Sequence, residues 1–323
     1  MSFKIIVDSC CDLTGTMLKD PCFVKVPLTI RVENSSFVDD ASLDRSDLLW
    51  AMKQSEDAPS TACPAPQSYL DAYQCGADDI YVVTLSALLS GSHNSAVQAR
   101  VLLEEEEPER NVHVFNSCSA SSGEVLTALK IRELASSGMP FKKVVREVEQ
   151  YICQMQTLFV LESLENLRKN GRLTKLQAVV TGALRIKLLM GATPQGEICK
   201  LGQALTMKQA LGKLVDRMAA DPDHQGRVAA VCHCNCLERA FALKEQIEAH
   251  GLKFELVDSF RIHEDIKRGY ASRDALIENY RKNIRMLAEC GIRIICYNFM
   301  PVFDWTRTQL DHKLPDGSTS LVY

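Results

Sequence analysis

Hydroxyl-bearing side chains follow three short apolar segments of this sequence, each at the point where a buried strand is expected to end. Asp8-Ser9, Ser86 and Asn116-Ser117 come directly after these segments. Because parallel strands end at one edge of their sheet, where ligands commonly bind, we expect these side chains to lie together. The helices that follow would add unpaired N–H groups with a partial positive charge. Hydroxyls beside such N–H groups favour a carboxylate or a phosphate as ligand.

Two serine clusters lead from these strand ends into predicted helices. They are Ser90-Gly91-Ser92 and Ser119–Ser122, and Gly91 allows a ligand to approach the backbone closely. Thr61, in the loop sequence STACPAP, is a further hydroxyl that can reach the same edge. The alternative is that each serine only caps a helix, which is its commonest use at such positions. Several clusters at one predicted edge favour a binding site, and the sequence leaves both interpretations open.

Short apolar runs alternate with helical patterns over the first half of the chain, and these elements must position the site. We expect strands at Lys4–Val7, Phe23–Ile30, Ile80–Leu85 and Val112–Phe115. We expect helices at Ser42–Gln54, Pro66–Tyr73, Asn94–Glu107 and Gly123–Ser136. This alternation with short connections indicates an α/β fold with a parallel sheet flanked by helices. We assign residues 1–155 to this first domain.

A second α/β domain is expected over residues 156–258. Its strands are expected at Thr157–Leu161, Ile186–Met190, Glu197–Lys200, Arg227–His233 and Phe254–Val257, the second and third forming a hairpin about Thr193–Gly196. Its helices are expected at Leu164–Lys169, Thr174–Thr181, Gln203–Ala219 and Leu237–His250. Residues 259–323 form a third segment, in which Ser272–Cys290 has the spacing of an amphipathic helix and Ile292–Phe299 that of a strand.

The composition is that of an ordinary globular protein. Hydrophobic residues make up 46% of the 323 residues, and the net charge of −4 gives no general attraction to nucleic acid. Met1–Lys4 leads directly into a strand without a signal peptide, and no apolar run is long enough to span a bilayer. The 13 cysteines are scattered and odd in number, which favours buried thiols over disulfides. We therefore expect a cytoplasmic protein with no stable membrane insertion.

Motifs of several enzyme classes are absent from the sequence. It contains no Gly-x-Ser-x-Gly nucleophile turn, no phosphate-binding Gly-x-x-x-x-Gly-Lys loop and no dinucleotide fingerprint. His93 could act as a base, but the sequence shows no acid partner for it. The segment CHCNC, Cys232–Cys236, could hold a metal, although on a strand its cysteines would share one face at a spacing unusual for zinc. We expect no catalytic residue, no metal and no cofactor.

Six ordered segments within residues 3–258 resemble the DegV family. They are VDSCCDL, VPLTIRVENSSFVD, STACPAPQSYLDAY, LSALLSGSHNSA, VFNSCSASSGE and LESLENLRKNGRLTK. The resemblance implies two α/β domains that hold a long-chain fatty acid in the cleft between them. It also implies a carrier that does no chemistry itself and presents the carboxylate of the acid to a fatty-acid kinase. An anion site without a catalytic base, which the residues indicate on their own, suits such a carrier.

The resemblance also implies roles for individual residues. Those expected at the carboxylate, as direct ligands, backbone donors or the floor of the site, are Thr61, Ser90, Gly91, Ser92, Asp8 and Ser9. The acyl chain would lie against Val179–Gly191 of the second domain. The basic turn, with Arg168, Lys169 and Arg172, would dock the kinase. The alternative for this turn is a helix C-terminus that is stopped by Gly171 and complemented by basic side chains.

The DegV pattern stops before the end of the sequence. A DegV protein should continue with a His-Thr-Gly-Pro-Gly-like turn, which adds a histidine to the carboxylate site, and with a last apolar strand, and neither occurs. Residues 259–323 instead resemble an internal stretch of mannonate dehydratase, through HEDIK, ENYRKNIRMLAECGI and CYNFMPVFDWTRT. We interpret the sequence as the product of a recombined, misassembled or chimeric gene, joined near LVDS.

This segment raises a second hypothesis, a manganese- or iron-dependent mannonate dehydratase. That (β/α) barrel needs about 250 residues, and residues 259–323 supply about two of its βα units. We therefore expect no catalysis from His263, Asn298 or Arg307. The predicted helix and strand could instead occupy the open edge of the second domain, with a loose polar tail from Asp304 onward. A metal sensor built on Cys232–Cys236 is a third hypothesis.

Overall fold

The computed structural model describes residues 2–14, 17–173, 176, 186–234, 236–254, 271, 273–278, 281, 309–313 and 319–322. The chain divides into two compact units. One unit contains residues 1–13 and 17–256, and the other contains residues 14–16 and 257–323.

A four-stranded parallel sheet forms the first half of the larger unit, as the alternation of strands and helices predicts. Its order is β2-β1-β6-β7, with β1 at Phe3–Asp8, β2 at Phe23–Val26, β6 at Asp79–Thr84 and β7 at Asn111–Asn116. In this register Asp8 lies beside Val26, and Thr84 lies beside Asn116. The carboxyl ends of the strands therefore share one edge.

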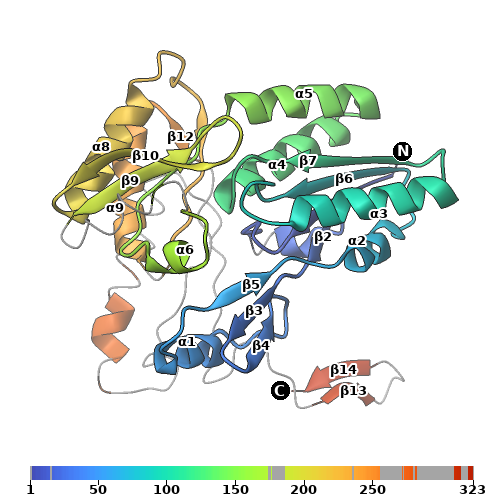
Figure 1. Ribbon diagram of the computed structural model, residues 1–323, viewed down its shortest axis with the longest axis horizontal. Coiled ribbons are helices and arrows are strands. Elements are labelled where there is room, and N and C mark those ends of the chain that lie inside the picture. Colours follow the sequence, from blue (N-terminus) through green and yellow to red (C-terminus); the bar gives the residue numbers. More distant parts are fainter. Residues whose placement is uncertain are drawn as a thin grey trace. The chain divides into compact units, whose positions relative to one another are not determined.

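Helices cover both faces of this sheet, because successive side chains of a strand point to opposite sides. The helices are α2 at Pro66–Tyr73, α3 at Ser92–Glu106, α4 at Ser122–Ser136 and α5 at Phe141–Gln154. Ile5 and Val7 of β1 pack in one core with α4 and α5, and Ile6 packs in another with α2 and α3 (Figure 1). Helix α5 was not predicted, although Val144, Val148 and Ile152 have helical spacing on its buried face.

The predicted strand Phe23–Ile30 is two strands. Because Pro27 has no N–H to donate, β2 ends at Val26, and β3 (Thr29–Val32) joins a second, antiparallel sheet. This sheet has the order β4-β3-β5, with β4 at Ser35–Val38 and β5 at Ser60–Ala62. The remaining elements of the first half are the short helix η1 at Met17–Lys19 and helix α1 at Arg45–Gln54. Strand β5 presents Thr61 opposite Ile30.

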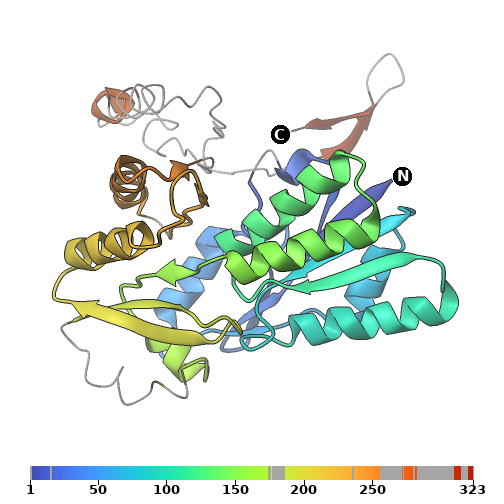
Figure 2. The same cartoon turned by 90° about the horizontal axis from the view of Figure 1, so that it is seen from above.

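The second half of the larger unit is built on the predicted hairpin. Strands β9 (Lys187–Ala192) and β10 (Ile198–Ala204) pair antiparallel, and β8 (Leu158–Phe159) pairs with β9. The other elements are α6 at Glu165–Lys169, α8 at Met207–Ala219, β11 at Val228–Ala229, α9 at Leu237–Ala249 and β12 at Lys253–Phe254. Figure 2 shows α8 between the hairpin and α9, and all three contribute to one apolar core.

Two predictions for this half are wrong in extent. The helix predicted from Gln203 begins at Met207, because β10 continues to Ala204 and Thr206 then caps the helix through the N–H of Gln209. The strand predicted at Arg227–His233 is limited to Val228–Ala229. Cys232 and Cys234 therefore do not lie on a strand, and Cys236 is the N-cap of α9.

In the smaller unit, residues 273–278 are helical, and β13 (Gln309–Lys313) pairs antiparallel with β14 (Thr319–Val322). This pairing replaces the loose tail that we predicted from Asp304. Most of the predicted helix Ser272–Cys290 lies outside the described residues. The same holds for the predicted helix Thr174–Thr181, of which only Leu176 is described. Also outside are the predicted strand Ile292–Phe299 and the single residues His263, Asn298 and Arg307. Among the described helices, none combines the length and the apolar character that crossing a membrane requires.

Candidate ligand site

Asp8 is fully buried at the carboxyl end of β1. Its Oδ1 accepts the N–H of Cys10 at 3.1 Å, and its Oδ2 accepts the N–H of Leu85 at 3.0 Å and the hydroxyl of Ser92 at 2.6 Å. Burial raises the pKa of the Asp8 carboxyl, and the hydrogen bonds from Ser92 and Leu85 oppose that rise. Asp8 thereby ties the ends of β1 and β6 to the first turn of α3.

Ser92 is the centre of a buried hydrogen-bond chain. Since its hydroxyl donates to Asp8, the hydroxyl of Tyr69 must be the donor in the 2.6 Å bond between Tyr69 Oη and Ser92 Oγ. The backbone N–H of Ser92 donates to Ser90 Oγ at 3.2 Å. The side chain of Ser92 is therefore engaged inside the protein, and its N–H already has a partner.

Ser90 differs from Ser92 because it is only half-buried. Its Oγ accepts the N–H of Ser92, which leaves its own hydroxyl hydrogen to donate elsewhere. Gly91 is exposed and forms the N-cap of α3. A Cβ at Gly91 would lie 3.1 Å from Cys63 Sγ, so the Ser90 loop and the Thr61 loop are in close contact. Ser90 and Gly91 thus bring a hydroxyl donor to a helix N-terminus.

Thr61 is exposed on β5 and contacts the basic turn from the second half. Arg172 Nη2 donates to Thr61 Oγ1 at 3.4 Å, and Asn170 Nδ2 donates to the carbonyl of Pro59 at 2.8 Å. Cys63, two residues after Thr61, lies against Gly91. Thr61, Ser90 and Arg172 therefore belong to one neighbourhood at the edge of the sheet.

Glu124, which the sequence analysis missed, is fully buried in the first turn of α4. Its Oε1 accepts the N–H of Ser121 at 3.1 Å in a capping box, and its carboxyl lies beside that of Asp8. Burial raises the pKa of Glu124 well above its ordinary value, and the charge of Asp8 raises it further. The Ser-x-x-Glu spacing of Ser121 and Glu124 was a readable signal for the cap, but not for the pairing with Asp8.

The remaining serines mostly hold the fold together. Ser9 Oγ accepts the N–H of Leu28 at 2.9 Å. Ser86 Oγ donates to the carbonyl of Gly196 in the β9–β10 turn at 2.8 Å, and Ser119 Oγ lies 2.7 Å from Thr157 Oγ1. Ser119 thus links two segments of the fold, and Ser121 takes part in the capping box of α4, as the capping interpretation predicts for it.

His93 and the basic residues of α6 were also selected from the sequence, and the structure gives each of them a place. His93 Nδ1 lies 3.2 Å from Thr84 Oγ1, and burial lowers the pKa of this histidine. Arg168 makes a two-point contact with Glu165, at 2.9 and 2.6 Å, and Lys169 is exposed. Both basic side chains lie on α6, which Asn170 and Gly171 end.

The cysteines of the CHCNC segment form no metal site in the described part of the chain, where no three His, Cys, Asp or Glu side chains gather for one. Cys232 and Cys234 are exposed, and the sulfur of Cys232 lies beside Ser121 and Asp12. Burial of that sulfur raises the pKa of Cys232 to about 12, although the residue as a whole is exposed. The described residues therefore give the metal-sensor hypothesis no geometric support.

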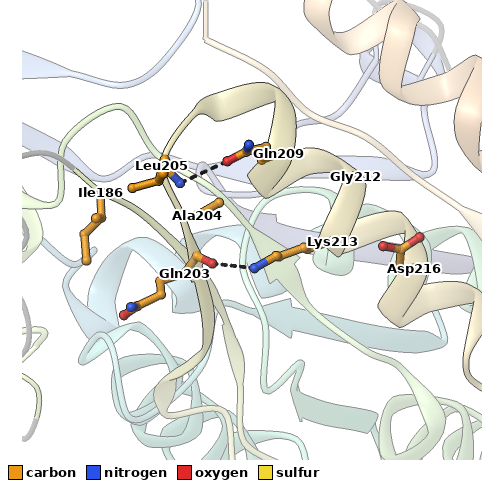
Figure 3. Close-up of a pocket in the computed structure, with 8 residues that line it drawn as sticks. All are labelled: Ile186, Gln203, Ala204, Leu205, Gln209, Gly212, Lys213 and Asp216. Atoms are coloured by element: carbon orange, nitrogen blue, oxygen red, sulfur yellow. Dashed lines mark hydrogen bonds between the residues drawn. The ribbon is translucent and has the colours of Figure 1, made fainter.

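A groove of about 610 Å³ lies between the end of β10 and α8 (Figure 3). It is lined by Ile186, Gln203, Ala204, Leu205, Gln209, Gly212, Lys213 and Asp216. Lys213 Nζ donates to the Gln203 carbonyl at 2.8 Å, and the Leu205 N–H donates to Gln209 Oε1 at 3.2 Å. None of the predicted carboxylate residues lines this groove.

Comparison with known proteins shows the family to which the chain belongs. The family model of DegV matches residues 2–262, and a DegV domain-containing protein of Streptococcus pyogenes is 37% identical over 230 residues, which are 71% of this chain and 82% of that protein. The chain belongs to the DegV family.

Solved structures of DegV proteins share the fold. A DegV family protein of Ruminococcus gnavus with vaccenic acid is 47% identical, with a TM-score of 0.76 over 80% of this chain and 93% of that one. The fatty acid kinase (Fak) B3 protein of Streptococcus pneumoniae, loaded with linoleic acid, is 36% identical, with a TM-score of 0.71 over 79% and 92%. The α/β fold with a parallel sheet flanked by helices is therefore the fold of these DegV proteins.

The C-terminal resemblance is also found. The family model of D-mannonate dehydratase matches residues 224–323, so residues 224–262 match both families. The boundary that we placed at residue 259 lies inside this match.

Proposed function

We propose that this DegV protein binds a long-chain fatty acid in the cleft between its two α/β domains and presents the carboxylate to a fatty-acid kinase without catalysing a reaction. The observation that carries the proposal is the 47% identity, over most of both chains, to the Ruminococcus gnavus protein with vaccenic acid. The likeness to the fatty acid kinase (Fak) B3 protein supports the kinase as partner. The acyl chain would extend into the second domain along Val179–Gly191, of which residues 186–191 belong to the described part of the chain.

The carboxylate would be bound by Ser90 and Thr61, next to the backbone of Gly91. Ser90 has a hydroxyl hydrogen to donate, and the N-terminus of α3 adds a favourable partial charge. We assign Arg172 to this group as well, because its guanidinium contacts Thr61 and can pair with a carboxylate. Arg168 and Lys169 remain candidates for docking the kinase. Asp8, Ser9 and the side chain of Ser92 would shape the site from behind.

The proposal is tested by the lipid that the purified protein holds. We expect a co-purifying fatty acid in native mass spectrometry, identified after extraction. Ser90→Ala removes a hydrogen bond to a charged group, worth about 1.5–3 kcal/mol, so the Kd for palmitic acid should rise roughly ten- to hundredfold. Ser137→Ala, an exposed serine at the end of α4, is the control and should bind as the parent does. A parent protein that neither holds nor takes up palmitic or oleic acid would contradict the proposal.

A second candidate function, mannonate dehydration, is favoured by the family match over residues 224–323. We expect no manganese-dependent loss of water from mannonate, because residues 224–323 are far fewer than the roughly 250 residues of such a barrel. Formation of the dehydrated product in the presence of Mn²⁺, and its loss on chelation, would establish this second function.

A further inference from the structure

Two carboxyl groups meet behind the proposed anion site, in the same buried space. Asp8 and Glu124 are both fully buried, and they come from β1 and α4. Through Ser92, Asp8 is only two hydrogen bonds from Ser90 Oγ, the proposed donor to the ligand. A charge on this pair therefore lies close to a bound carboxylate.

Asp8 receives more hydrogen bonds from N–H and O–H donors than Glu124 does. Asp8 accepts two N–H groups and one hydroxyl, so its ionised form is well satisfied. Glu124 Oε1 accepts one N–H, whereas Glu124 Oε2 is buried and no N–H or O–H of another described residue reaches it. A proton on Glu124 Oε2 removes this deficit, because the acid can then donate to Asp8. The hydrogen-bond pattern thus assigns the proton to Glu124 and the charge to Asp8.

The ionisable groups around the Asp8–Glu124 pair would not stabilise a second negative charge on it. Its ionisable neighbours are Asp12 and the thiols of Cys10 and Cys11 from the segment after β1, and the phenol of Tyr69 from α2. These are acids or neutral groups, and like charges in a buried site strongly disfavour double ionisation.

We propose that Glu124 is a positioning residue of the anion site, which keeps one proton on the Asp8–Glu124 pair so that the buried charge behind Ser90 stays at minus one when a fatty-acid carboxylate binds. This inference rests on the proposed function. When Glu124 loses the proton, its charge repels both Asp8 and the ligand. Asp8 would then hold Ser92, and with it the Ser90 loop, less well.

The test compares the pH dependence of palmitic acid binding in the parent, in Glu124→Gln and in Glu133→Gln. Glutamine mimics the protonated acid, since it accepts the Ser121 N–H and donates to Asp8 but cannot ionise. Glu133 is exposed on the same helix and provides the control. Between about pH 6 and pH 10, binding by the parent and by Glu133→Gln should weaken by up to about tenfold per pH unit once Glu124 ionises, and Glu124→Gln should lack this loss.

Two further measurements separate charge from structure. Hexadecanol has the same chain as palmitic acid but no charge. Its binding affinity should therefore fall less than that of palmitic acid as the pH rises. The infrared carbonyl band of a buried protonated carboxylic acid should be present in the parent at neutral pH and absent from Glu124→Gln. Identical pH profiles of parent and Glu124→Gln, or no such band in the parent, would overturn the role of Glu124 and leave the proposed function standing. Failure of every variant to bind palmitic acid would instead reject the proposed function itself.

Discussion

Serine hydroxyls that look alike in the sequence do different work in the DegV protein. Ser92 is buried between Tyr69 and Asp8, whereas Ser90 is half-buried and keeps a hydrogen to donate. The difference depends on what surrounds each hydroxyl, and spacing along the chain does not contain that information. A serine cluster at a strand end can therefore hold a proposed ligand residue and a structural residue only two positions apart.

Tyr69→Phe tests the structural side of this division. The change removes the donor to Ser92 Oγ and leaves a buried acceptor without its partner, so we expect a loss of about 1–2 kcal/mol in the free energy of unfolding. Tyr81→Phe is the matched control, because Tyr81 Oη is also buried but has no hydrogen-bond partner among the described residues. Removing that hydroxyl should change stability by less than about 0.5 kcal/mol or increase it. Equal losses in urea unfolding of the two variants would contradict the hydrogen-bond chain.

Some residues of the candidate ligand site could be predicted from the sequence, and others could not. Thr61 and Ser90 stand out as hydroxyls in loops at a predicted sheet edge. Tyr69 lies in the predicted helix Pro66–Tyr73, but nothing in that segment shows that its hydroxyl meets Ser92. Arg172 was assigned to docking, and only the fold brings it to Thr61, 111 positions away in the sequence. Contacts of this range follow from tertiary structure and leave no local signal.

At the scale of elements, hydrophobic alternation predicted the sheet well. All four parallel strands were anticipated within a few residues, because buried strands with few polar residues are easily recognised. The errors in the predicted elements concern where a strand ends. Pro27 divides one apolar run between two sheets, and β11 is much shorter than its apolar run predicts. Helix α5 was overlooked despite apolar residues at helical spacing.

Gly196 shows how one turn joins the two halves of the larger unit. It has φ of +84°, and a Cβ there would lie 2.3 Å from Ser86 Oγ and 2.8 Å from Cys118 Cα. Gly196→Ala should therefore lower the free energy of unfolding by about 1–2 kcal/mol for the positive φ and by about 1–3 kcal/mol more for the overlap. Gly138→Ala is the control, since φ is +78° and nothing lies within 4 Å of its Cβ.

The measurement is urea unfolding of both variants and the parent. Gly138→Ala should show the backbone cost alone, and Gly196→Ala should be clearly less stable than Gly138→Ala. If the two variants were equally stable, the β9–β10 turn would not be packed tightly against the Ser86 and Cys118 loops.

At the scale of the whole molecule, two families meet in one chain. Residues 2–262 match the DegV family, and residues 224–323 match D-mannonate dehydratase. The absence of the expected C-terminal histidine turn was the signal in the sequence that the DegV pattern changes before the end of the chain. Whether the second family segment supports the first is a question of stability, which local patterns do not answer.

Deleting residues 259–323 tests that question. The four hydrophobic cores of the described residues, which include those on both faces of the parallel sheet, all lie between Phe3 and Leu252. We therefore expect the shortened chain to unfold cooperatively, with a loss below about 1 kcal/mol and a fall in Tm of no more than about 2–4 °C. It should also retain palmitic acid, because Thr61, Ser90 and Arg172 remain. Thermal unfolding of both chains, each with and without palmitic acid, provides the measurement. A fall of more than about 10 °C, or the loss of a cooperative transition, would mean that the appended segment supplies part of the DegV fold.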